Sequence, residues 1–262
     1  MRQRVTVLEK YPLDPAEEQL LRDNLAASQA LLLLLGVAGC VLVSGLSDGK
    51  WLAALAGFGW ARVIAEALVA LDVPQALLLG LGMAAAFLLV GTAMESWAMR
   101  SEEGRRGVVE ARRGVNGEMV RLSLPLLALL MCMAGFAEEL LFRVVALGGV
   151  LVGLSLVMPV APAALLAVTF SSIVFWMAHV RYRDLYSTIL VLLMAVALGL
   201  CYLFTASLTA VWVAHTAYDL ADLVVERRRM ATEEDYFGGA APSRVMLDEL
   251  DEMEEQDEEE DD

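Results

Sequence analysis

The segment AGFAEELLFRVVAL, residues 134–147, places two carboxylates and a guanidinium in a run of apolar side chains. In a helix, residues four positions apart lie on one face, so Glu139 can pair with Arg143 while Glu138 points elsewhere. An ionised side chain in hydrocarbon costs about 2.5 kcal/mol or more, so such residues pair or serve a function. Glu138 is therefore a candidate general base or acid. The alternative is a structural role in the same ion-pair network.

The two histidines of the chain, His179 in SSIVFWMAHV and His215 in AVWVAHTAYDL, both lie in later apolar runs. A lone histidine in an apolar helix is more often a packed residue, bonded to a neighbouring backbone group or hydroxyl, than a reactive one. Here both histidines are in such runs, and Asp219 follows His215 by about one helical turn, where it can orient the imidazole. Together with Glu138, these residue types can activate a water molecule inside a membrane.

The same residues leave two forms of water activation open. Glu138, His179 and His215 could bind Zn²⁺ as three protein ligands, with an open position for water. The sequence contains no HExxH motif, and a glutamate with two histidines also suffices to activate water without a metal. The cysteines each stand alone in an apolar run and predict neither a disulfide framework nor a thiolate metal site; they are Cys40, Cys132 and Cys201.

Composition places these residues in a membrane protein. Of the 262 residues, 58% are hydrophobic and the mean hydropathy is +0.61, against about 45–50% apolar residues in ordinary soluble domains. Residues 1–26 are charged and lack the apolar core of a cleaved signal peptide, so we expect the first hydrophobic segment to direct insertion. Much of the net charge of −15 comes from the acidic stretch 247–262, which we expect to be disordered and solvated.

Apolar runs predict an all-α bundle of about six transmembrane helices. We place the spans at residues 27–46, 76–97, 122–147, 160–180, 185–205 and 207–225. Residues 51–73, which include Arg62 and Glu66, could also span but are assigned to the membrane interface. Residues 144–158 fit half of another span, a re-entrant segment or a helix extension, which would give up to eight crossings.

Arginine-rich segments orient these spans, because such loops stay in the cytoplasm. They are residues 98–121, Arg181 with Arg183, and residues 227–229. We expect a multi-pass protein of the cell membrane with both termini cytoplasmic. One conflict follows: in a helix entering at Leu122, Glu138 lies about 24 Å deep, whereas His179 stands next to the cytoplasmic Arg181.

Three short motifs resemble those of the CPBP family of intramembrane proteases, which includes the Rce1-like CAAX prenyl proteases and the bacterial Abi-type bacteriocin self-immunity proteins. The segments EELLFR (138–143), FWMAH (175–179) and HTAYD (215–219) look like the EExxxR, FxxxH and HxxxN/D motifs of that family. The resemblance covers about residues 122–225. It divides the chain into a cytoplasmic segment 1–26, N-terminal spans with a basic loop over 27–121, a catalytic core over 122–225 and a mostly disordered cytoplasmic tail over 226–262.

The resemblance implies an intramembrane endopeptidase in which Glu138 and His179 activate a water molecule while His215 lies across the scissile carbonyl. Glu139 and Arg143 would orient or support the site. Better-studied relatives have Asn where this chain has Asp219, so we assign Asp219 to orienting His215.

The resemblance also favours a metal-free glutamic mechanism without a cofactor, with a divalent metal such as zinc as the alternative. The partners it implies are the lipid bilayer and a membrane-associated protein or peptide substrate, and no nucleic acid. Two other functions stay open. One is a catalytically inactive relative that binds a membrane protein or confers self-immunity. The other is an ion or proton carrier, for which the sequence offers no internal repeat.

Overall fold

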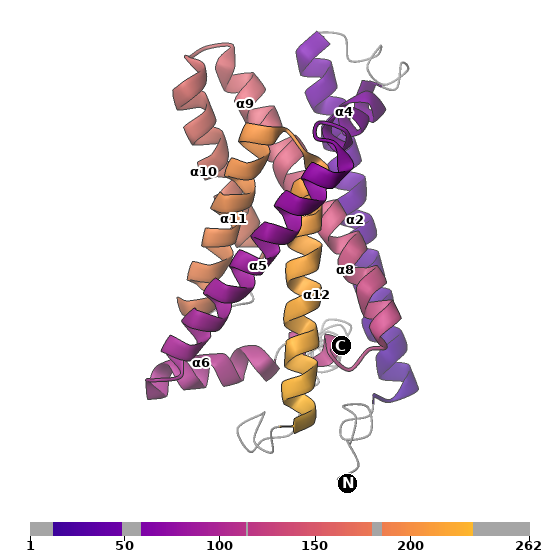
Figure 1. Cartoon of the computed structure of the whole chain (residues 1–262). Helices are drawn as coiled ribbons and strands as arrows, with labels where there is room; N and C mark the ends of the chain where they lie inside the picture. Colours follow the sequence, from indigo (N-terminus) through magenta and orange to yellow (C-terminus); the bar gives the residue numbers. More distant parts are fainter. Residues whose placement is uncertain (1–12, 49–58, 114, 180–184, 233–262) are drawn as a thin grey trace, which may run out of the picture.

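The computed structural model describes residues 13–48, 59–113, 115–179 and 185–232, and every element in these ranges is a helix (Figure 1). Six helical segments there are long and apolar enough to cross a membrane, which confirms the predicted bundle of about six spans. They are Pro15–Gly45, Val73–Ala98, Leu124–Ser155, Val160–Ala178, Leu185–Thr205 and Leu208–Thr232. Of the predicted tail, residues 226–232 continue the last helix and residues 233–262 lie outside the described ranges.

The elements follow one another in the order α2 (Pro15–Asp48), α4 (Gly59–Leu68), α5 (Val73–Ala98), α6 (Glu102–Arg113), α7 (Val115–Met119), α8 (Leu124–Glu139), η1 (Leu140–Leu147), α9 (Gly148–Ser155), α10 (Val160–Ala178), α11 (Leu185–Thr205) and α12 (Leu208–Thr232). Helix starts follow local chemistry. At α5, the Asp72 side chain accepts a hydrogen bond from the Gln75 backbone N–H at 2.9 Å, and Pro74 stands in the first turn. A capping carboxylate and an early proline both favour a helix start there.

The segment predicted to lie at the interface contains α4, and the structure describes residues 59–73 of its range 51–73. This helix has 10 residues, about 15 Å of length, which is too short to cross a bilayer. Its apolar face, with Trp60, Val63 and Ile64, packs on the main hydrophobic core, while Arg62 and Glu66 pair on the exposed face at 3.6 Å. Residues 49–58 lie outside the described ranges. The placement of this segment at the interface stays a prediction.

The ambiguous residues 144–158 are largely a helix extension. The helices α8, η1 and α9 form one continuous rod from Leu124 to Ser155, with a π-helical segment at its centre. This rod and α10 form an antiparallel hairpin. Glu138 lies 17 residues before Ser155 and His179 lies 19 residues after Val160, so both are roughly 26–29 Å from the turn. The depth conflict disappears because α10 is much shorter than the rod and ends level with Glu138.

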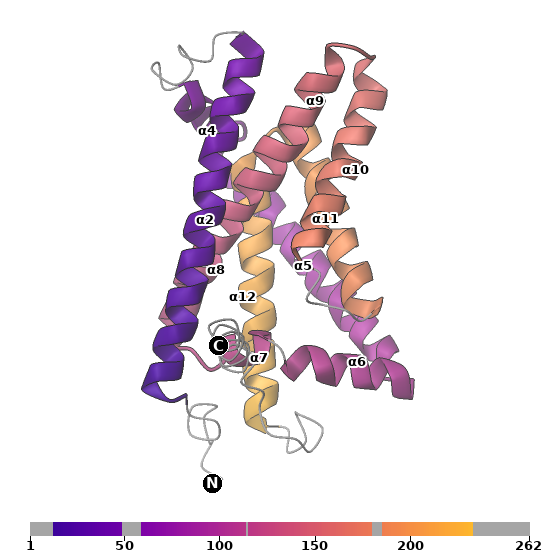
Figure 2. The ribbon, with the colours of Figure 1, turned by 180° about the vertical axis from the view of Figure 1, so that it is seen from behind.

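The central helix of the bundle is α12, which packs against α5, α8 and α11 (Figures 1 and 2). Helix α2 lies along the rod and contacts α8, η1 and α9. Helix α6 lies across one end of the bundle, where α2 begins and α12 ends, and the turn between α9 and α10 lies at the opposite end. The ends of the described helices at Pro15 and Thr232 are therefore on the same side.

Glycines set how closely α12 approaches its neighbours. A Cβ atom added at Gly135 of α8 would lie 2.5 Å from Oγ1 of Thr216, and one at Gly80 of α5 would lie 2.7 Å from the backbone oxygen of Ala210. Real Cβ atoms essentially never come so close to a neighbour, so a side chain at either position would force the packed helices or Thr216 to shift. Gly135 is one turn before Glu139 and Thr216 follows His215, so this contact positions the candidate site.

Candidate active site

Glu138 and Glu139 are the last two residues of α8, directly before the π-helical segment η1. Such widened turns are often found at functional sites. The predicted pair between Glu139 and Arg143 is present: Arg143 Nε donates to Glu139 Oε2 at 2.9 Å, and both side chains are fully buried. A buried pair of this kind needs further hydrogen bonds to offset desolvation.

Those further bonds come partly from α10. Nη1 of Arg143 donates to Oγ of Ser171 at 3.0 Å, and Ser171 in turn donates to the backbone oxygen of Phe142 at 2.7 Å. The guanidinium also lies 4.9 Å from the ring centre of Phe175. Ser171 was not singled out in the sequence. The spacing of Ser171, Phe175 and His179 could have indicated its position, because residues at four-residue intervals share one face of a helix.

His215 connects three carboxylates. Its Nδ1 lies 2.8 Å from Oε1 of Glu139, and its Nε2 lies 3.3 Å from Oδ2 of Asp219 and 3.9 Å from Oε2 of Glu138. The sequence placed Asp219 beside His215, and the structure brings them together. The contact with Glu139 was not predicted. Glu139 uses one oxygen for Arg143 and the other for His215, so it links the arginine to the imidazole.

His179 is the C-cap residue of α10, and its side chain faces Glu138 of α8. Its Nε2 lies 3.5 Å from Oε2 of Glu138, and its Nδ1 lies 2.8 Å from the backbone oxygen of Phe175. Because a carbonyl can only accept, Nδ1 of His179 donates to it, which leaves Nε2 as the acceptor in the neutral ring. The ring also stacks on Phe175, with centres 4.4 Å apart.

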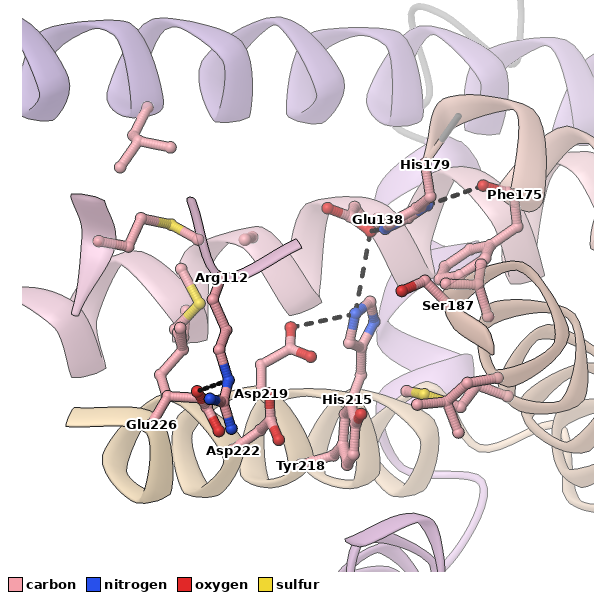
Figure 3. Close-up of a pocket in the computed structure, with 18 of the residues that line it drawn as sticks. Arg112, Glu138, Phe175, His179, Ser187, His215, Tyr218, Asp219, Asp222 and Glu226 are labelled. Atoms are coloured by element: carbon pink, nitrogen blue, oxygen red, sulfur yellow. Dashed lines mark hydrogen bonds and ion pairs between the residues drawn. The ribbon is translucent and has the colours of Figure 1, made fainter. Parts of the chain in front are cut away.

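Of the residues described above, Glu138, Phe175, His179, His215 and Asp219 line one cavity of about 320 Å³. Glu138, His179, His215 and Asp219 point toward one another within it, as Figure 3 shows. Oε2 of Glu138 is buried and has no hydrogen-bonding partner among the described residues. A buried carboxylate oxygen without a partner is rare and calls for an explanation such as a bound water or a reactive role.

The same residues bear on whether a metal is bound. In the part of the chain that the structure describes, no group of three or more His, Cys, Asp or Glu side chains has the arrangement of a metal site. Glu138, His179 and His215 are nevertheless the residues that would hold a divalent metal. Of their nitrogens, Nε2 of His215 faces the Asp219 carboxylate at 3.3 Å.

A second charged group closes the other end of the cavity. Arg112 of α6 lies 2.9 Å from Glu95 of α5 and 3.5 Å from Glu226 of α12. Arg229 contacts the same two carboxylates at 2.6 and 2.7 Å. The sequence predicted Arg112 and Arg229 only as markers of orientation. Their pairing depends on three helices meeting at this end, which no local pattern reveals.

The part of the chain that contains this site resembles a known protein family. Residues 120–221 match the family model of the type II CAAX prenyl endopeptidase Rce1-like domain. No curated protein and no solved structure matches the chain. The matched range contains Glu138, Glu139, Arg143, both histidines and Asp219. The match confirms the predicted resemblance and supports a membrane endopeptidase. Residues 120–221 of the chain are thus similar to the Rce1-like domain of the type II CAAX prenyl endopeptidases.

Proposed function

We propose that this protein hydrolyses a peptide bond of a membrane-associated protein or peptide, with Glu138, His179 and His215 as catalytic residues. The observation that carries the proposal is the buried oxygen Oε2 of Glu138, which accepts no hydrogen bond from the residues that the structure describes and lies between Nε2 of His179 and Nε2 of His215. A water molecule there would meet two acceptors, the carboxylate and the lone pair of His179. Both polarise it toward attack.

In the proposed reaction the water oxygen bonds to the scissile carbonyl carbon while Glu138 takes one proton from the water. The carbonyl oxygen becomes an oxyanion. When the carbon–nitrogen bond breaks, the proton held by Glu138 passes to the leaving nitrogen. The products are a carboxylic acid and an amine, and the Glu138 carboxylate is restored.

His215 is proposed to stabilise the oxyanion. Carboxylate oxygens lie near both of its ring nitrogens, those of Glu139 at Nδ1 and Asp219 at Nε2. With carboxylates near both sides, the His215 ring can carry a proton on each nitrogen. The Nε2–H, which Asp219 orients, would then be shared with the scissile carbonyl oxygen, where a donor stabilises the developing charge. Glu139 and Asp219 are then positioning residues, and Arg143 holds Glu139.

The same geometry supports a metal-free mechanism. A metal ligand must offer a lone pair, and an Nε2 of His215 that donates to Asp219 has none to offer. We therefore expect cleavage to continue in the presence of a chelator. If a metal were bound by Glu138, His179 and His215, it would supply a more acidic water, and a chelator would stop the reaction.

Orientation is part of the proposal. Helix α6, with Arg105 and Arg106 exposed, lies at the same end of the bundle as the beginning of α2 and the end of α12. Arginine-rich segments remain in the cytoplasm. We infer that this end faces the cytoplasm of a cell in whose membrane the protein is embedded.

The test is cleavage of a panel of quenched-fluorescence peptides, including prenylated CAAX peptides, by purified wild type and Glu138→Ala, each with and without chelator. We expect wild type to cleave at least one peptide with or without chelator, and Glu138→Ala to cleave none while remaining folded. Loss of wild-type cleavage in chelator would replace the metal-free mechanism by the metal one. Full activity in Glu138→Ala would contradict the proposal. Failure of wild type on every peptide would favour the inactive binding or self-immunity function.

A further inference from the structure

The cavity contains a second buried oxygen without a partner. Among the described residues that line it, Oε2 of Glu138 and Oε1 of Gln29 are the buried side-chain oxygens that accept no hydrogen bond. Glu138 is the proposed base. Gln29 belongs to α2, outside the Rce1-like range 120–221, and its side chain is only 5% exposed.

Helix α2 brings Gln29 to the cavity on a defined face. Leu25, Ser28, Gln29 and Leu32 all line the cavity, and their spacing is that of one helical face. The helix is held against the rod that carries Glu138, since a Cβ atom at Gly36 would lie 3.0 Å from the Leu140 side chain. The position of Gln29 beside the site is therefore fixed by close helix packing.

Several other polar groups on the cavity wall already have partners. Oγ of Ser28 donates to the backbone oxygen of Leu25 at 2.9 Å, and the Tyr186 hydroxyl donates to the backbone oxygen of Gly91 at 3.0 Å. Arg112 is held by Glu95 and Glu226. A buried amide oxygen in a membrane helix costs free energy unless a donor hydrogen-bonds to it, so Oε1 of Gln29 calls for a ligand that donates.

We propose that Gln29 is a substrate-positioning residue that hydrogen-bonds the peptide main chain beside the scissile bond. The inference rests on the proposed function of the site. The amide carries one acceptor and two donor hydrogens, which match the N–H and C=O groups that every peptide presents. It has no charge with which to select an ionic side chain, and Leu25 and Leu32 flank it on the same face. The N-terminal spans thus contribute a subsite to the Rce1-like core.

The first test compares Gln29→Met with Gln75→Met, a matched substitution at an exposed glutamine. For the fluorogenic peptide that wild type cleaves best, Gln29→Met should raise KM about tenfold, the effect of leaving one buried hydrogen bond unmade, with kcat little changed. Gln75→Met should change neither constant. Gln29→Met should also unfold at or above the wild-type temperature, since it removes an unsatisfied buried oxygen.

A second test identifies the main chain as the ligand. Main-chain N–H groups of the peptide near the scissile bond are replaced one at a time by ester oxygens. One replacement should raise KM about tenfold for wild type and leave KM of Gln29→Met unchanged, because the two changes remove the same hydrogen bond. Additive effects at every position would overturn the inference.

Binding separates this inference from the proposed function. The dissociation constant of the same peptide is measured with Glu138→Gln and with Glu138→Gln combined with Gln29→Met. Weaker binding in the double variant supports a peptide subsite at Gln29 even if cleavage does not depend on Glu138. Equal binding of the peptide by the two variants would show that Gln29 meets only water, and the inference would fail while Glu138-dependent cleavage could still stand.

Discussion

At the scale of single residues, Glu139 is proposed to support the site without reacting. Its two oxygens are used by Arg143 and His215, and its side chain is fully buried. An imidazole held at one nitrogen by a carboxylate has a fixed orientation. The Glu139–Arg143 pair, which the helical spacing predicts, is thereby connected to the imidazole of His215.

Asp219 provides the prediction at this scale. Asp219→Asn keeps an oxygen that can accept a hydrogen bond from Nε2 of His215, so we expect cleavage to be largely retained. Asp219→Leu removes that oxygen from a similar volume, and kcat should fall about 10- to 100-fold, as for other partners that orient a reactive histidine. Rates with the best peptide of the panel measure both. Equal losses in the two variants would show that the charge, and not the orientation, matters.

The residues of the site were largely predictable because charge in an apolar run is conspicuous. Glu138, His179 and His215 stand out in the sequence for that reason, and the pairs Glu139–Arg143 and His215–Asp219 follow from a spacing of four. Ser171 and Gln29 were not predictable, because an uncharged polar residue in a membrane span is common. The contact between His215 and Glu139 requires knowing which helices are neighbours, and that is a property of tertiary packing.

At the scale of elements, close helix approach and the π-helical segment control the site. The sequence did not predict how the rod ends. Residues 144–158 are almost all apolar, so they show no periodic pattern of polar residues that would distinguish a helix extension from a re-entrant segment. The packing of α9 on α10 decides for the extension. The π-helical turns of η1 left no signal in the residue types.

The prediction at this scale concerns α5 and α12. Gly80→Leu should destabilise the fold by about 1–3 kcal/mol or more and lower activity, because a side chain there overlaps the backbone oxygen of Ala210. Gly82→Leu, two residues away, meets no atom within 4 Å and should have little effect. Thermal unfolding in detergent measures both. Equal stability of the two variants would contradict the described packing of α5 on α12.

At the scale of the whole molecule, a network of ion pairs marks one end of the bundle, called the charged end here. Helix α6 lies at the charged end. The ion pairs there join Glu95, Arg112, Glu226 and Arg229. The turn between α9 and α10, where Leu156 and Val157 are exposed, lies at the opposite end. Since Val108 and Arg112 of α6 line the cavity that contains Glu138, α6 borders the cavity at the charged end.

The prediction at this scale is one of sidedness. In a chain whose natural cysteines are replaced by alanine, Glu103→Cys on the exposed face of α6 should react with a membrane-impermeant thiol reagent only from the cytoplasmic side. Val157→Cys, at the opposite turn, should react only from the other side. Labelling of both positions from one side would contradict the arrangement, and exchange of the two patterns would reverse the inferred orientation.

The central claim is that Glu138 activates the attacking water, and its most direct measurement is kcat of Glu138→Gln in lipid vesicles. This change keeps the shape of the side chain and removes its ability to take a proton. Glu66→Gln, at an exposed glutamate of α4, is the matched control. We predict that kcat falls about 10²- to 10⁴-fold in Glu138→Gln, with an unchanged unfolding temperature, and stays at the wild-type value in Glu66→Gln. A kcat of Glu138→Gln equal to that of wild type would contradict the account.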